Sequence, residues 1–152
     1  MKNNNALVAA TASITVQRPS DVVFSFVCNP LNDPIWNRKV VSVEQLTPGP
    51  AAVGTKFRQA AAFVGGRIES EWTITEYQPN TLFRGESTRG LIPFHGSYTF
   101  ATKFDCTTIT KHVSFDLSGV LPPFFVLSVV EALLKKELES SFYLLKKIIE
   151  RA

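Results

Sequence analysis

Apolar and polar residues alternate along much of the first 117 residues of the chain. In residues 8–16 the even-numbered positions are apolar and the odd-numbered ones are mostly polar, which is the period-two pattern of a strand with one buried face. Similar segments follow, separated by turn signals such as the proline-rich breaker at 47–50 and the Gly65-Gly66 pair. The pattern predicts seven strands, over residues 8–16, 40–46, 54–64, 67–77, 82–87, 94–104 and 108–117.

Three other segments have helical signals. Residues 22–27 are apolar and follow a helix-start signal at 19–21, and residues 29–37 predict a turn and a second short helix that ends near Trp36. From 121 to 152, after Pro122 and Pro123, apolar residues recur at helical spacing while lysines and glutamates occupy the opposite face, which predicts one long amphipathic helix. Its apolar face consists of Leu127, Val130, Leu134, Leu138, Ser141, Phe142, Leu145, Ile148 and Ile149.

Together these elements predict an α+β fold: one strand, two short helices, six consecutive strands and one long helix. A meander with one apolar face curves because neighbouring strands twist, and the long helix is the element able to cover its concave face. A helix touches only part of a concave sheet, so we expect a gap between the two that would be the natural ligand site. The length of 152 residues suits a single domain, 1–152.

Composition and charge narrow the classes of partner. The chain is 45% hydrophobic with a net charge of only +3, and its basic residues are scattered, so we expect no nucleic-acid partner. The apolar residues between 117 and 134 are interrupted by Gly119, two prolines and Glu131, so we expect no integral membrane association. Cys28 and Cys106 lie far apart without metal-type spacing, which predicts free thiols in a reducing, cytoplasmic compartment.

Two charged residues are candidates for chemistry in the expected gap. Lys111 shares strand parity with the apolar residues of its segment, so it should point inward, where burial is costly for an ammonium group. Glu131 lies near the apolar face of the long helix. A Lys111–Glu131 pair would anchor a ligand carbonyl or hydroxyl, or act as an acid/base couple. The alternative is that Lys111 reaches solvent at the end of the sheet and Glu131 pairs with Lys135 one turn later.

The other polar residues do not indicate metal or cofactor chemistry. His95 and His112 fall on the parity opposite to the aromatic face, which predicts the outer, solvated side of the sheet. Neither histidine has a metal-type partner at local spacing, so we expect no metal site. The sequence contains no phosphate loop, dinucleotide fingerprint or Ser-His-Asp order, so we expect no cofactor.

This order of elements, with five local strings, resembles the START-like or Bet v 1-like (SRPBCC) superfamily, in particular its polyketide cyclase/dehydrase and lipid-transport branch. The strings are ITVQRPSDVVF at 14–24, NDPIWN at 32–37, VGTKF at 53–57, ITEYQP at 74–79 and GSYTF at 96–100. The resemblance implies a helix-grip fold, with a curved seven-stranded antiparallel sheet and a long C-terminal helix over an apolar cavity. Members of the superfamily bind sterols, lipids, hormones or polyketides there, and some catalyse cyclisation or dehydration. The strings themselves are turn and core signatures.

The leading functional hypothesis is a protein that binds or transports a small hydrophobic ligand, such as a lipid or a polyketide, as a monomer or homodimer. The alternative is a polyketide cyclase, aromatase or dehydratase in which Lys111, Glu131 or Tyr98 moves a proton in the same cavity. A third hypothesis is an interaction protein that recruits a partner through the apolar start of its long helix. The predicted ligand-binding residues are Phe57, Trp72, Tyr98, Phe100, Lys111, Phe115, Leu127, Glu131 and Leu134.

Overall fold

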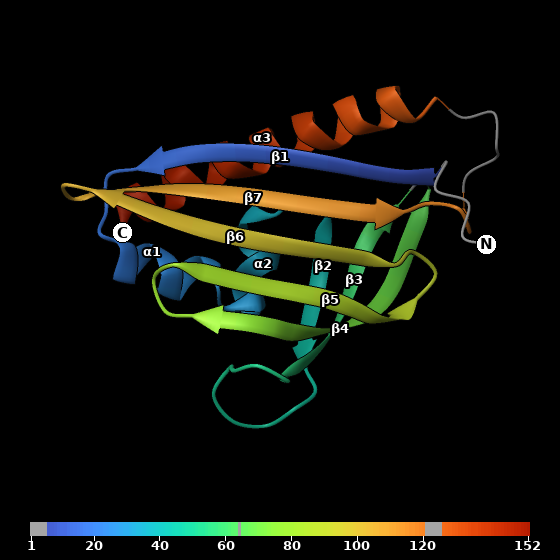
Figure 1. Ribbon diagram of the computed structural model, residues 1–152, viewed down its shortest axis with the longest axis horizontal. Coiled ribbons are helices and arrows are strands. Elements are labelled where there is room, and N and C mark those ends of the chain that lie inside the picture. The colour runs from blue at the N-terminus through green and yellow to red at the C-terminus, as the bar shows by residue number, and fades with distance from the viewer. Residues whose placement is uncertain (1–5, 64, 121–125) are drawn as a thin grey trace.

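Seven antiparallel strands form one sheet, in the order β1-β7-β6-β5-β4-β3-β2, in the computed structural model, which describes residues 6–63, 65–120 and 126–152 (Figure 1). The strands are β1 (Leu7–Val16), β2 (Val40–Gln45), β3 (Lys56–Phe63), β4 (Gly66–Gln78), β5 (Leu82–Gly90), β6 (Phe94–Lys103) and β7 (Cys106–Asp116). The helices are α1 (Ser20–Val27), the 3-10 turn η2 (Pro30–Asn32), α2 (Asp33–Trp36) and α3 (Leu127–Arg151).

The predicted strands and helices are all present, with ends that differ by a few residues. The signal at 19–21 makes Ser20 a plausible N-cap, but in the structure Ser20 is already the first residue of α1. The N-cap residue is Pro19, which has no side-chain cap. The predicted start of the long helix at 121–125 lies outside the described residues.

The first and last strands along the chain, β1 and β7, pair with each other. β1 runs antiparallel to β7 along its whole length, from Leu7 opposite Asp116 to Val16 opposite Thr107. On the outer face this pairing is reinforced by side-chain hydrogen bonds of 2.8 Å between Ser13 and Thr110 and between Thr15 and Thr108. The last strand of the chain therefore lies beside the first, and residues far apart in sequence share one concave face.

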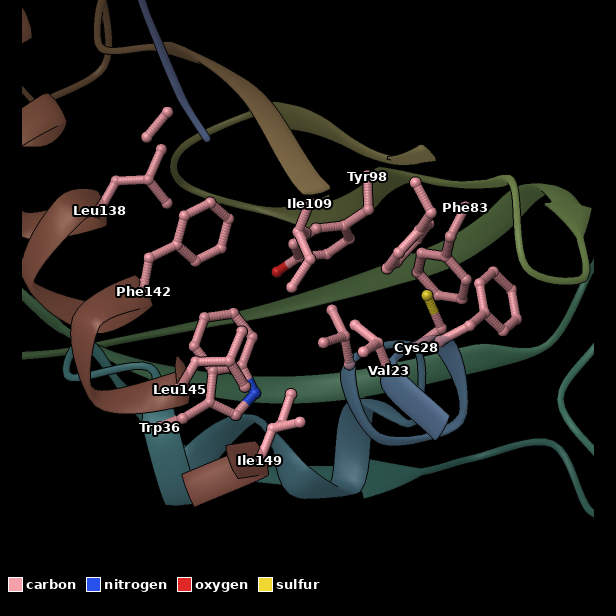
Figure 2. Close-up of a cluster of buried hydrophobic side chains, with 14 of the residues drawn as sticks. Val23, Cys28, Trp36, Phe83, Tyr98, Ile109, Leu138, Phe142, Leu145 and Ile149 are labelled. Carbon is pink, nitrogen blue, oxygen red and sulfur yellow. The ribbon is translucent and has the colours of Figure 1, made fainter. Parts of the chain in front are cut away.

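The main core lies between this concave face and the helices. Figure 2 shows Trp36 of α2 beside Phe142 and Leu145 of α3, and the rings of Trp36 and Phe142 stack with centroids 6.0 Å apart. The buried Ser141 hydroxyl accepts a hydrogen bond of 3.1 Å from the Arg38 amide, which fixes the end of α2 against α3. The C-terminal half of α3 is thus held by the short-helix segment as well as by the sheet.

The N-terminal half of α3 packs elsewhere. It runs beside β1 (Figure 1), and its inner side chains join a second, smaller apolar cluster formed around Val8, Ile92 and Leu117. On its outer side, Val126, Val129 and Leu133 are 58%, 54% and 62% exposed, so this part of the helix covers the edge of the sheet and leaves apolar side chains in solvent.

Candidate functional site

A cavity of about 170 Å³ lies between the inner face of the sheet and the segment that carries α1, η2 and α2. Most of its wall is apolar, and the sheet contributes aromatic side chains from β4, β5, β6 and β7. The side chains that line it are Val27, Pro30, Asp33, Asn37, Lys39, Val40, Gln59, Ala61, Trp72, Phe83, Phe94, Tyr98, Lys111, Val113 and Phe115, with Gly85 and Gly96.

Polar groups gather in one part of this wall. Lys111 lies opposite Tyr98 in the β6–β7 register, and its ammonium nitrogen stands 4.8 Å from the centroid of the Tyr98 ring and 5.9 Å from that of Trp36. Within the described part of the chain, the ammonium group makes no hydrogen bond or direct ion pair; its nearby opposite charge is Asp33, on the first turn of α2. An ammonium group over two aromatic faces is stabilised by cation–π attraction, so the rings take part of the role of a counter-ion.

Burial shifts the titration of these groups. Loss of solvation raises the pKa of the Asp33 carboxyl from its ordinary value to about 7, although the positive charge of Lys111 acts in the opposite direction. Burial also lowers the pKa of Lys111, against the pull of Asp33. Burial and the negative charge of Asp33 together raise the pKa of Tyr98 well above its usual range and raise that of the Cys28 thiol beyond any physiological pH.

This arrangement can both orient a ligand and move a proton. Near neutral pH the Asp33 carboxyl is partly protonated and can donate or accept a hydrogen bond, while Lys111 and the Tyr98 hydroxyl are donors. A carboxyl group poised near pH 7 has the acidity that suits general acid–base catalysis. The polar groups lie together in a wall that is mostly apolar, which fits a ligand with an oxygen at one end.

Two glycines deepen the cavity at the middle of the sheet. Gly85 of β5 and Gly96 of β6 are directly paired, and both line the cavity. A Cβ atom at Gly85 would stand 2.8 Å from the Trp72 ring, closer than packed atoms approach. The absence of a side chain at Gly85 therefore leaves room for the Trp72 ring at the cavity wall.

Four of the residues predicted to bind a ligand line this cavity: Trp72, Tyr98, Lys111 and Phe115. Two others form the packing behind it. Phe57 is fully buried and stacks on Trp72 at 4.7 Å between centroids, and Phe100 is buried with its ring edge against Phe24, at 5.1 Å.

The three predicted residues of the long helix lie outside the cavity wall. Leu127 and Leu134 are half-buried against the second apolar cluster. Glu131 accepts a hydrogen bond of 3.0 Å from the backbone amide of Ala9 on β1, so neither the predicted Lys111–Glu131 pair nor the alternative pair with Lys135 forms. The reason is that α3 crosses the edge of the sheet at β1, while the short-helix segment, rather than α3, faces the cavity.

Sequence reasoning missed Asp33 and Trp36 as site residues. Both belong to the NDPIWN string, which resembled a turn and core signature. The sequence did contain a signal for Asp33, which is an acidic residue between two apolar helical segments. A carboxylate in such a position is costly to bury without a partner, so it indicates a nearby polar or charged group. Its proximity to Lys111 depends on how the short helices fold back onto the sheet.

A second hollow, of about 320 Å³, lies on the outer face of the sheet and includes both histidines. His95 and His112 are exposed there, as predicted, and their rings are hydrogen bonded at 2.7 Å to the hydroxyls of Ser114 and Thr11.

The described residues contain no group of three metal-ligating side chains. Among the described helices, none has the length and apolar character needed to cross a membrane. Both cysteines are free thiols.

Solved structures with a similar fold cover almost the whole chain at low identity. A protein from Thermus thermophilus matches with a TM-score of 0.79 and 17% identity over 93% of this chain and 96% of its own. The Zhui aromatase/cyclase from a Streptomyces species matches with a TM-score of 0.77 and 16% identity over 95% and 94% of the two chains. A START superfamily protein from Mycobacterium smegmatis matches with a TM-score of 0.77 and 15% identity over 94% and 97%.

These likenesses establish the helix-grip fold expected from the sequence. No curated protein matches the chain. The family model described as polyketide cyclase / dehydrase and lipid transport matches residues 8–150. That match spans all seven strands except Leu7 at the start of β1, and nearly all of α3, so the chain belongs to the polyketide cyclase/dehydrase and lipid-transport family.

Proposed function

We propose that the protein binds a compact hydrophobic molecule that carries an oxygen function at one end. The observation that supports this most directly is the cavity itself, whose aromatic and aliphatic wall includes one polar cluster, formed by Asp33, Tyr98 and Lys111. Apolar pockets with a few placed polar groups are the usual form of small-molecule sites. Family membership supports a hydrophobic ligand.

The volume of the cavity favours a compact ligand over a long-chain lipid. At about 170 Å³, the cavity is smaller than the roughly 300–1,000 Å³ of typical drug-sized sites. A flat ring system or a short, folded polyketide-like chain suits this space and could stack on Trp72 and Phe83. A two-chain lipid would require the described walls to move apart.

The polar cluster specifies which ligand end is recognised. A carbonyl or phenolic oxygen can accept hydrogen bonds from Lys111 and from the Tyr98 hydroxyl, and a hydroxyl can donate to Asp33. A ligand with no oxygen would leave the Lys111 ammonium buried without a hydrogen-bonding partner, which costs binding energy. We therefore expect oxygenated aromatic compounds to bind more tightly than hydrocarbons of the same shape.

Native mass spectrometry of freshly purified protein, with an organic extract of the same sample, tests this function. The expected result is a discrete small molecule that leaves on denaturation, or, for apo protein, a thermal shift with naphthol that naphthalene does not reproduce. The Lys111→Met variant should lose the preference for naphthol, while the matched Lys135→Met variant, on the exposed side of α3, should keep it. Equal shifts with both compounds in the parent protein would contradict the proposed polar recognition.

A catalytic role as a cyclase, aromatase or dehydratase is the second candidate. The observation that favours it is the Asp33 carboxyl, whose pKa of about 7 suits proton transfer at neutral pH. Asp33→Asn should then abolish turnover of a reactive polyketide-like chain while binding of a stable analogue persists. Turnover that survives this substitution in folded protein would rule out Asp33 as the proton carrier.

A further inference from the structure

Lys111 is a half-buried amine at the wall of the largely apolar cavity. It lies in the middle of β7, between Ala12 of β1 and Tyr98 of β6, and its nitrogen faces the rings of Tyr98 and Trp36. Within the described residues, neither a hydrogen bond nor a direct carboxylate contact holds the proton on this nitrogen. Other described lysines differ: Lys146, for example, pairs with Glu150 at 3.2 Å on the surface.

Burial lowers the pKa of Lys111 even though Asp33 and the two aromatic rings favour its charged form. The neutral, nucleophilic amine is therefore easier to reach here than at a solvent-exposed lysine. The ionisable groups that face Lys111 are Asp33 of α2 and Tyr98 of β6. Cys28, just after α1, interacts with both of these groups. Burial keeps Tyr98 and Cys28 neutral, so Asp33 is the group that supplies opposite charge. Lysines in hydrophobic pockets are the ones that serve as carbonyl nucleophiles in proteins.

We propose that Lys111 forms a protonated imine with the carbonyl carbon of a ketone held in the cavity. This inference rests on the ligand site proposed above and adds a covalent step to it. The geometry that supports it is an amine without an ion pair, facing into a largely apolar cavity whose wall also holds the carboxyl group of Asp33. The substrate class is a ketone on an apolar, preferably aromatic, frame.

The step balances with groups already in the cavity. The Lys111 nitrogen lone pair forms the C–N bond, and the carbonyl π pair moves to oxygen, which takes the proton of the Asp33 carboxyl group. Asp33 then removes one proton from nitrogen and returns it to the hydroxyl group, so that the C–O bond breaks and water leaves. The products are an iminium ion on Lys111, a carboxylate on Asp33 and one water molecule.

The iminium would give the cavity a way to activate carbon. Its positive nitrogen withdraws electrons from the adjacent C–H bond, so the Asp33 carboxylate can remove that proton while the iminium π pair moves to nitrogen. The resulting enamine carbon can attack a second carbonyl group of the same chain, which is a cyclisation. Expulsion of a β-hydroxyl group from the enamine, with a proton from Asp33, would instead be a dehydration. Both are reactions of oxygenated carbon chains with carbonyl groups.

Borohydride trapping tests this inference on the full chain. The protein is incubated with benzylacetone, a small aromatic ketone, at neutral pH and treated with sodium borohydride, which reduces an iminium to a stable secondary amine. The expected result is about one adduct per chain, heavier by the mass of the ketone less one oxygen atom, and located on Lys111 by peptide mapping. Peptide mapping of the parent protein makes this result independent of whether any variant folds.

Two arginine substitutions serve as controls. Lys111→Arg keeps a positive charge but cannot form an imine, so the adduct should be lost. Lys135→Arg changes an exposed lysine of α3 that does not line the cavity, and trapping should remain at the parental level. The absence of an adduct on Lys111, or an adduct spread over surface lysines with none preferred, would overturn the inference. A thermal shift with benzylacetone before reduction separates this failure from failure of the proposed ligand site, because binding without trapping leaves the latter intact.

Discussion

Replacing Asp33 by asparagine should remove a pH-dependent cost to stability. Burial raises the pKa of this carboxyl group to about 7 in the folded protein. In an unfolded chain the pKa of an aspartate is about 4. Between these two pH values the folded protein holds a proton that the unfolded chain has released, so the free energy of unfolding falls as pH rises. Asparagine has a similar shape and does not titrate, so this component of the fall should disappear in Asp33→Asn.

The size of the effect follows from the same shift. A group that is protonated in one state and ionised in the other changes stability by about 1.4 kcal/mol per pH unit. From pH 5 to pH 7 the variant should therefore gain at most about 2.7 kcal/mol relative to the parent protein. Asp33 borders a cavity that water can enter, and this screening reduces the expected gain to roughly 2 kcal/mol.

Urea unfolding of both proteins at pH 5, 6, 7 and 8 measures this difference. Burial lowers the pKa of Lys111, so its own titration changes stability in the opposite direction, with folded protein favoured as pH rises through that lowered pKa. The same comparison is therefore made in a Lys111→Met background, where Asp33 loses the neighbouring positive charge and should keep its proton to higher pH still. Parallel stability curves for parent and Asp33→Asn, in both backgrounds, would refute the idea that this carboxyl group is buried and proton-bearing.

Two further substitutions test the packing around the cavity and the role of α3. Gly85→Ala places a methyl group 2.8 Å from the Trp72 ring and should cost about 1–3 kcal/mol in urea unfolding, whereas Gly66→Ala, with no atom within 4 Å, should be nearly neutral. Glu131→Ala removes the acceptor of the Ala9 amide and should cost about 1 kcal/mol. Glu131→Gln should restore most of that loss, and ligand binding should be unchanged in both variants; lost binding in folded Glu131→Gln would contradict the position of α3.

The pattern of alternation predicted more of the fold than of the site. Each strand carries its own period-two signal, because the side chains of a strand alternate between the two faces of the sheet. That local rule placed His95 and His112 outside and put Lys111 on the inner face. The same rule could not tell whether an inner aromatic side chain borders the cavity or packs against other side chains. Phe57 and Trp72 were therefore both predicted to bind a ligand, although only Trp72 lines the cavity.

Whether the predicted residues of the long helix reach the cavity depends on how the helices sit on the sheet. Helical spacing correctly identified the apolar stripe of α3, but one stripe serves two surfaces: its C-terminal part packs on Trp36, and its N-terminal part joins the cluster around Val8. Glu131 lies near the second surface and meets the edge strand β1. Helix periodicity reports which residues share a face, and it carries no information about which partner covers that face.

The sequence by itself therefore determined the strands, the helices and the inward or outward direction of most strand side chains, since these follow from local backbone geometry. Only the tertiary structure decided that the short segment with Asp33 and Trp36 folds back over the concave sheet and meets Lys111. That contact joins residues far apart in the chain, and its energy comes from burying surfaces that no local pattern pairs. The chemistry proposed for the cavity depends on this one long-range arrangement.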